Sequence, residues 1–305
     1  MTKTNRCGPD WLHNKLAAGD LLIIDGAMGT ELEARGVPMN DKAWSGAALL
    51  SHPEIVREAH ADYIRAGAQV VTTNTFATGR SLLDGAGLGE QVAKINRAAV
   101  EAARQARDEV AEQPVAIAGS MCEWAAESGP WADAERLSTS YREQADTLAE
   151  AGVELIALEM CSHPARSKLL AQAALATGLP VWLGISCKQE SESKRVVGFD
   201  PPYADIDALV CELVELDIGV VNIMHSAIGD TAAGLSIVKR HWSGALGVYP
   251  ESGHFVMPNW QFVDIIEPNA LVEETRVWVK NGAQILGGCC GLGVDHIRAL
   301  KAAFG

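Results

Sequence analysis

Eight short runs of aliphatic and β-branched residues recur along the chain, separated mostly by longer amphipathic segments. The runs cover residues 21–25, 69–73, 115–119, 155–159, 181–186, 220–223, 246–249 and 285–287. Helical segments are expected at 53–66, 89–112, 139–151, 164–176, 204–216 and 269–281. Apolar strands that alternate with helices form parallel sheets covered on both faces. Eight such units in 305 residues predict an α/β fold of the (β/α)₈ TIM-type barrel class, with an open doubly wound sheet as the alternative.

The ends of several expected helices support this alternation. Gly67, Gly152 and Gly282 each follow a helical segment and lie two or three positions before the start of an apolar run. A glycine in this place is typical of a helix C-cap that leads into a short loop. No composition shift divides the chain, so a single barrel domain over residues 1–305 is predicted.

Charge and cysteine content exclude several classes of protein. The net charge of −14, from 25 basic and 39 acidic residues, disfavours nucleic acid and anionic membranes as partners. The first twelve residues lack an apolar signal segment, and no apolar run approaches the roughly 20 residues that span a bilayer. Seven cysteines, an odd number in a large chain, favour a reducing cytoplasm over a disulfide framework.

Polar residues gather where the expected strands end. They include Asp25, Thr73, Asn74, Ser120, Glu159, Ser186, Cys187, Asn222, His225, Tyr249, Glu251, Cys289 and Cys290. In a (β/α)₈ barrel these positions meet at one rim, where such enzymes place their chemistry. A carboxylate at Glu159, between apolar neighbours, requires a partner or a ligand. Trp44, in the loop after the first strand, is equally compatible with the core and with a pocket wall.

The segment 287–291, Gly-Gly-Cys-Cys-Gly, follows the last expected strand. Adjacent cysteines rarely bridge each other, because a disulfide between neighbours is strained. Flanking glycines permit the backbone to bend so that both sulfurs face one soft metal ion. Cys289 and Cys290 are therefore interpreted as two thirds of a zinc–thiolate site.

These residues resemble the homocysteine S-methyltransferase family of zinc-dependent (β/α)₈ barrels, over nearly the whole chain. The matching segments are 24–32, Trp44-Ser45, His52-Pro53, 73–76, 118–120, Glu159, 249–253, Trp278, 281–283, 287–291 and His296-Ile297. In the segment 249–253, Tyr-Pro-Glu-Ser-Gly, the family has Asn in place of Glu251. It implies that Cys289 and Cys290 are two of three zinc ligands.

The resemblance also assigns the remaining site residues. It implies that Asp25 and Glu159 hold the amino-acid end of homocysteine as the candidate catalytic carboxylates. Gly26 would help through its backbone, and Trp44 would line the pocket of the methyl donor. Asn222 matches a family position and is taken as a third substrate-binding residue.

One position departs from the family pattern. The family's third ligand is a cysteine that directly follows the residue matched by Asn222, and Ile223 stands there instead. Strand side chains alternate, so His225 would share the side of Ile223 if the strand continued and would then complete a Cys₂His set. Cys187 is the competing third ligand, and weak or absent metal binding is the remaining alternative.

The predicted activity is therefore zinc-dependent thiol S-methylation. A methyl group would pass from a small sulfonium or quaternary ammonium donor to homocysteine, giving methionine, and the chain resembles the short S-methylmethionine-type relatives more than the betaine-using ones. The alternatives are another thiol acceptor or onium donor, or a non-catalytic zinc- or thiol-binding barrel. A lyase or aldolase with Lys188 as Schiff-base lysine is disfavoured. A cytoplasmic monomer or small homo-oligomer is expected.

Overall fold

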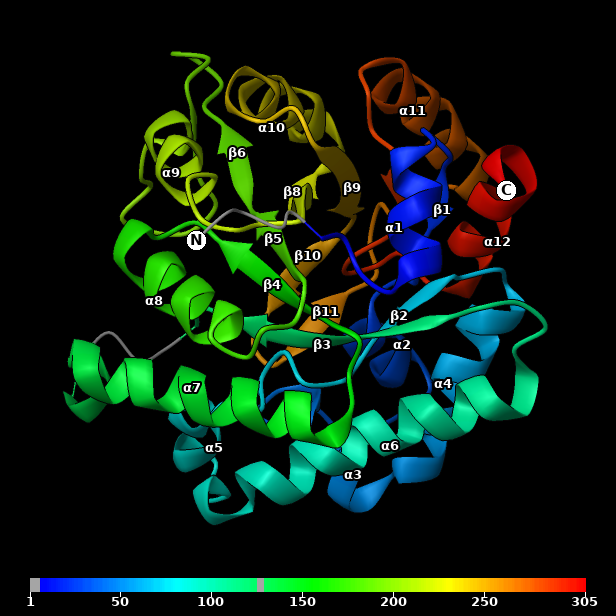
Figure 1. Cartoon of the computed structure of the whole chain (residues 1–305). Helices are drawn as coiled ribbons and strands as arrows, with labels where there is room; N and C mark the ends of the chain where they lie inside the picture. The colour runs from blue at the N-terminus through cyan, green and yellow to red at the C-terminus, as the bar shows by residue number, and fades with distance from the viewer. Residues whose placement is uncertain (1–5, 125–128) are drawn as a thin grey trace.

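Eight parallel strands form one closed sheet at the centre of the computed structural model, which describes residues 6–124 and 129–305 (Figure 1). The strands are β1 (Leu22–Ile23), β2 (Val70–Thr72), β3 (Ala116–Cys122), β4 (Leu155–Cys161), β5 (Val181–Ile185), β8 (Val220–Ala227), β9 (Ala245–Glu251) and β12 (Ile285–Leu286). Their order is β1-β12-β9-β8-β5-β4-β3-β2, and a parallel bridge between Ile24 and Val70 joins the two ends of that order. The (β/α)₈ barrel is confirmed, and the open-sheet alternative is excluded.

Helices surround the barrel on its outer side, except for α1, which covers its amino-terminal end (Figure 1). They are α1 (Asp10–Ala17), α2 (Met28–Ala34), α3 (Ala48–Ser51), α4 (Pro53–Arg65), α5 (Arg80–Gly85), α6 (Val92–Val110), α7 (Ala134–Ala151), α8 (Pro164–Leu175), α9 (Ile206–Leu213), α10 (Ile228–His241), α11 (Pro268–Lys280) and α12 (Val294–Phe304), with 3₁₀ turns η1 (Ser45–Ala47), η2 (Gly89–Gln91) and η3 (Gly129–Ala132). The six expected helices are all present, with boundaries shifted by a few residues. Helix α7 begins five residues before the expected position, because the Asp133 side chain accepts the Arg136 N–H and caps it.

The three glycines expected to end helices do so. Gly67, Gly152 and Gly282 have φ values of +108°, +92° and +100°. This left-handed conformation is one that glycine adopts without steric cost. Each glycine therefore turns the chain from a helix into the next strand, as its position in the sequence predicted. None of the helices in the described ranges is long and apolar enough to cross a lipid bilayer.

The barrel interior is filled at its amino-terminal end. Leu12 and Leu16 of α1 join a buried cluster with inward-facing strand residues such as Trp182. The Trp182 indole N–H donates to the Cys7 carbonyl at 2.6 Å and attaches this segment to the barrel. A larger apolar cluster packs between the outer face of the strands and the helices. Open space inside the barrel is left at the carboxyl ends of the strands.

Two antiparallel hairpins extend the barrel at that end. Strands β6 (Cys187–Gln189) and β7 (Val196–Gly198) follow β5, and β10 (His254–Val256) and β11 (Asn259–Gln261) follow β9. Glu33 of α2 accepts the backbone N–H of Trp260 at 2.9 Å and the Asn259 side-chain amide at 2.7 Å. These contacts hold the second hairpin across the barrel rim.

A buried carboxylate, Glu123, connects the end of β3 to the start of α8. Glu123 accepts from the Ser162 N–H (2.9 Å), the Ser162 hydroxyl (3.0 Å), the His163 N–H (2.8 Å) and the Ser167 hydroxyl. Its side chain is 4% exposed, so these donors have no access to water as a replacement partner. The carboxylate thus satisfies backbone groups at the N-terminus of a helix, where a negative charge is stabilised.

We expect Glu123→Ala to lower the free energy of unfolding by about 2–4 kcal/mol, because it leaves several buried donors without an acceptor. Glu123→Gln retains one acceptor oxygen and should cost clearly less. Urea titrations of both variants measure the difference. Equal stabilities for wild type and Glu123→Ala would refute this structural role.

Candidate active site

A cavity of about 420 Å³ opens at the carboxyl ends of the barrel strands. Seven of the eight residues proposed from the sequence line it, namely Asp25, Gly26, Trp44, Glu159, His225, Cys289 and Cys290. The eighth, Asn222, is fully buried in the strand β8 but does not line the cavity. Its amide nitrogen and oxygen have no hydrogen-bond partner in the described structure. The expected direct contact between Asn222 and substrate is therefore not supported by its position.

The Gly-Gly-Cys-Cys-Gly segment is held between the ends of β1 and β9. The Cys289 N–H donates to the Pro250 carbonyl at 2.7 Å, and the Ser252 N–H donates to the Cys290 carbonyl at 2.9 Å. Gly291 has a φ of +81°, and a Cβ atom there would lie 1.8 Å from the Ser252 carbonyl oxygen. Only glycine fits this position, and the tight loop places both sulfurs at the cavity.

His225 reaches the same place through an irregularity in β8. The pairing of β8 with β9 shifts register between Met224 and Ala227, and His225 has a φ of +39°. Ile223 packs in the outer apolar cluster, whereas His225 lines the cavity. The argument from strand alternation is therefore wrong, because the bulge turns the His225 side chain to the opposite side from Ile223.

Three potential metal ligands meet in this region. One donor atom from each of His225, Cys289 and Cys290 lies within 4.8 Å of the other two, and the His225 Nδ1 is 3.4 Å from the Cys289 sulfur. Cys187 is not part of this group. Its sulfur is 3.6 Å from the Ser226 hydroxyl, and its side chain packs in the outer apolar cluster.

Neighbouring groups set the charge of these ligands. A hydrogen bond from Cys290, assisted by His225, holds the pKa of Cys289 well below its usual value, whereas the same contact raises the pKa of Cys290. Burial opposes protonation of His225, but the Cys289 thiolate and the Glu251 carboxylate outweigh burial and raise its pKa to about 9. The structure therefore concentrates negative charge on sulfur where a cation would bind.

Two carboxyl groups lie in the same cavity. Asp25 accepts from the Thr72 N–H at 2.6 Å and from the Thr72 hydroxyl at 3.0 Å, and Glu159 accepts from the Ser120 hydroxyl. Burial raises the pKa of Asp25 to about 7 and that of Glu159 to about 8. A cationic group that enters the cavity would favour the ionised form of both carboxyls and gain a strong interaction.

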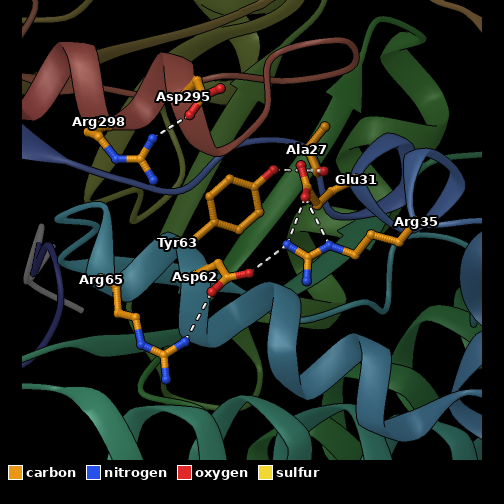
Figure 2. Close-up of polar contacts among 8 residues, drawn as sticks. All are labelled: Ala27, Glu31, Arg35, Asp62, Tyr63, Arg65, Asp295 and Arg298. Carbon is orange, nitrogen blue, oxygen red and sulfur yellow. Dashed lines mark hydrogen bonds and ion pairs between the residues drawn. The ribbon is translucent and has the colours of Figure 1, made fainter.

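Polar contacts, one buried and the others partly buried, lie next to the loop that carries Asp25 and Gly26. The Tyr63 hydroxyl donates to the Ala27 carbonyl at 3.1 Å, and Arg35 bridges Glu31 (2.8 Å) and Asp62 (2.9 Å) (Figure 2). A Cβ atom at Gly26 would lie 2.2 Å from the Leu292 carbonyl oxygen. The close packing fixes the loop, and with it the Asp25 carboxyl, against the loop that carries the cysteines.

Aromatic side chains form the outer wall of the cavity. Trp44 contacts Phe76 and Phe255 edge-to-face with ring centroids 6.2 Å apart in each pair, and Phe76 contacts Trp124 at 5.3 Å. Trp260 and Phe199 flank His225 at 6.2 Å and 4.9 Å. A Cβ atom at Gly29 would lie 2.3 Å from the Trp44 ring, so this glycine makes room for the indole.

Part of the cavity lining has no counterpart among the residues predicted from the sequence. Phe199, Asp200, Phe255 and Trp260 line the cavity but belong to the hairpins or to the segments beside them. The eight-run pattern contains no signal for these hairpins. Within residues 6–124 and 129–305, the cavity is lined by four carboxylic acids and by neither lysine nor arginine. A cavity of this composition favours cations.

These features define a (β/α)₈ barrel with a thiolate–imidazole metal site, buried carboxyls and an aromatic wall at its carboxyl end. The model of the homocysteine S-methyltransferase family matches residues 22–304. The chain belongs to this family of methyltransferases.

Individual relatives agree with this assignment. Homocysteine S-methyltransferase of Escherichia coli is 32% identical over 307 residues, covering 93% of this chain and 95% of the relative. Selenocysteine methyltransferase of Astragalus bisulcatus is 27% identical and covers 95% and 94%. The crystal structure of the homocysteine methyltransferase MmuM from Escherichia coli, in a metallated form, has a TM-score of 0.76 at 27% identity and covers 96% of this chain and 98% of that one.

Proposed function

We propose that this protein transfers a methyl group from a small sulfonium or quaternary ammonium donor to the thiol of homocysteine, giving methionine, with zinc held by Cys289, Cys290 and His225. The observation that carries the proposal is the meeting of three metal-binding side chains and two buried carboxyls in one aromatic-walled cavity. Family membership supports methyl transfer as the reaction class. The residues that line the cavity support the assignment of the metal ligands, the acceptor-binding carboxyls and the donor-binding aromatic wall.

The donor set suits zinc. Two cysteines and one histidine are soft and borderline ligands, and three protein ligands leave a fourth position of tetrahedral zinc available. A bound zinc ion would lower the pKa of the acceptor thiol and so supply a nucleophilic thiolate at neutral pH. The low pKa of Cys289 supports the fit, because metal ligation by cysteine requires the thiolate.

The carboxyl groups account for recognition of the acceptor. Asp25 and Glu159 lie in the same cavity as the cysteines, and an amino acid brings an ammonium group. We assign Glu159 to that ammonium, because burial makes its carboxylate costly unless a cation is present. Asp25 and the backbone at Gly26 would hold the remaining polar atoms of the amino-acid end.

The aromatic wall suits a cationic methyl donor. Trp44, Phe76 and Trp124 form one continuous edge-to-face series, and onium groups are stabilised over aromatic faces. In the transfer, the acceptor sulfur forms a bond to the methyl carbon while the carbon–sulfur or carbon–nitrogen bond of the donor breaks. The donor leaves as a neutral thioether or amine, so its affinity for the acidic cavity falls after transfer.

Product formation from a panel of donors tests this function. We expect purified, zinc-loaded protein to convert homocysteine to methionine with at least one sulfonium or quaternary ammonium donor, measured by mass spectrometry of the isotopically labelled methyl group. Selenocysteine and simple alkyl thiols serve as alternative acceptors. A zinc-loaded protein that methylates none of the acceptors from any donor would contradict the proposal, and one that prefers another acceptor would revise the substrate.

The cellular setting follows from the same chemistry. Both proposed cysteine ligands, Cys289 and Cys290, lie outside any disulfide in the structure. Reduced thiols are maintained in the cytoplasm. We therefore expect a cytoplasmic enzyme that acts as a monomer or small homo-oligomer.

A further inference from the structure

Glu251 lies behind His225, on the side away from the cysteines. The His225 Nε2 is 3.2 Å from a Glu251 carboxylate oxygen, whereas its Nδ1 is 3.4 Å from the Cys289 sulfur. The two side chains are only 10% and 11% exposed. The imidazole thus connects the carboxylate to the sulfur, and all three groups line the cavity.

We propose that Glu251 is a positioning residue, which orients the His225 ring and fixes its tautomer so that Nδ1 binds the metal. This inference rests on the metal site of the proposed function. A neutral imidazole has one N–H and one lone pair, so only one nitrogen is available to a metal. A carboxylate that accepts the N–H of Nε2 leaves the lone pair on Nδ1, facing the sulfurs, and increases its donor strength.

The backbone around His225 makes such support necessary. The residue lies in a bulge with a φ of +39°, outside the regular pairing of β8. The Ser186 hydroxyl donates to its carbonyl at 2.7 Å and holds the backbone, while Phe199 packs against the ring at 4.9 Å. Neither contact distinguishes one ring nitrogen from the other. Glu251 supplies that distinction.

The strand register brings the two residues together. After the shift at the bulge, Glu251 of β9 pairs with Ala227 of β8, two residues beyond His225. The chain departs from its family resemblance at Ile223, two residues before His225, and at Glu251. A histidine ligand needs a hydrogen-bond acceptor for the nitrogen that does not bind the metal, whereas a cysteine ligand has no second donor atom that needs one. The two departures therefore form one functional unit.

A direct ligand role for Glu251 is less consistent with the geometry. Within the described residues, the group of mutually close donor atoms contains His225, Cys289 and Cys290 and does not include Glu251. The carboxylate instead contacts the nitrogen that faces away from the cysteine sulfur. Its contribution should therefore depend on the presence of the imidazole.

Metal titrations of the full-length protein test the positioning role. Zn²⁺ affinity is measured in competition with a chromophoric chelator, and the absorption bands of the Co²⁺-loaded protein report ligand type and geometry. We expect Glu251→Ala to weaken Zn²⁺ binding by about 10- to 100-fold, the usual effect of removing such a partner. Glu251→Gln retains an acceptor oxygen for the Nε2 proton and should lose clearly less.

Two further variants separate positioning from other effects. Asp200→Asn removes a carboxylate of the same cavity whose charge also acts on His225 but which accepts a hydrogen bond from Trp124, and it should change Zn²⁺ affinity less than Glu251→Ala. In a His225→Ala background, Glu251→Ala should have almost no further effect. An unchanged affinity and Co²⁺ spectrum in Glu251→Ala would overturn the proposal, as would an effect that persists in full without His225.

The outcomes also distinguish this inference from the proposed function. If Zn²⁺ binding in wild type does not depend on Cys289 and Cys290, the metal site itself is refuted. If binding depends on both cysteines and on His225 but not on Glu251, only the positioning role fails. Circular dichroism of the metal-free variants checks that each one is folded.

Discussion

Replacement of Cys289 or Cys290 by alanine is expected to remove bound zinc and to lower methyl transfer by more than ~100-fold. Removing a residue that hydrogen-bonds to a metal ligand commonly lowers metal affinity or activity by about 10- to 100-fold. Loss of a direct ligand should therefore lower activity by more than that. Without the metal, an alkyl thiol acceptor is mostly protonated near pH 7 and is a poor nucleophile. Zinc content by elemental analysis and initial rates of methionine formation measure the two effects.

Cys187→Ala provides the matched control for this experiment. Cys187 was the competing third ligand, but its sulfur lies beside Ser226 in the outer apolar cluster. The variant should retain one zinc per chain and its activity. Loss of zinc from Cys187→Ala, or full zinc occupancy in Cys289→Ala, would contradict the proposed ligand set.

Glu159→Gln is expected to lower kcat/KM for homocysteine by ~100- to 4000-fold while leaving zinc content unchanged. Removing one partner of a buried ion pair typically costs about 3–5 kcal/mol, and about 1.4 kcal/mol corresponds to a factor of ten. The effect should fall mainly on KM for the acceptor. A thiol acid that lacks the amino group should be used equally poorly by both proteins, because it forms no pair with Glu159.

The pH dependence provides a second measurement on the same variant. Burial raises the pKa of Glu159 to about 8, so the carboxylate fraction in the free enzyme increases as pH rises from 6 to 8. The ionised form binds an ammonium group, and KM for homocysteine should therefore fall over this interval. The fall should be smaller in Glu159→Gln. The same pH profile in both proteins would exclude Glu159 from ammonium recognition.

The barrel and the cysteine pair could be predicted because their signals are local in sequence. Apolar strand runs and helix-ending glycines such as Gly152 and Gly282 define the alternation of elements. Cys289 and Cys290 are adjacent and flanked by glycines, so one short segment contains both sulfurs and the flexibility to direct them. These properties do not depend on where distant segments lie.

The remaining parts of the site depend on tertiary contacts that no local pattern encodes. His225 reaches the cavity through a bulge, which is defined by pairing with β9 and not by the residues of β8 alone. Phe255 and Trp260 reach it because Glu33, more than 200 residues away in sequence, accepts hydrogen bonds from the hairpin backbone and the Asn259 amide. Asn222 was assigned to substrate binding by its match to a family position, but it is buried in β8 and does not line the cavity.

The site combines residues at the ends of barrel strands with residues on a hairpin, and the two groups can change at different rates in evolution. The proposed metal ligands and ammonium-binding carboxylate lie at the ends of barrel strands, whereas Phe255 and Trp260 lie on a hairpin joined to the barrel by a few polar contacts. Loops on a rigid barrel accept sequence change more readily than the strands that support them. Selection for a new methyl donor can therefore act on residues of the aromatic wall that lie outside the barrel strands, such as Trp44 and Phe255, without displacing the metal ligands.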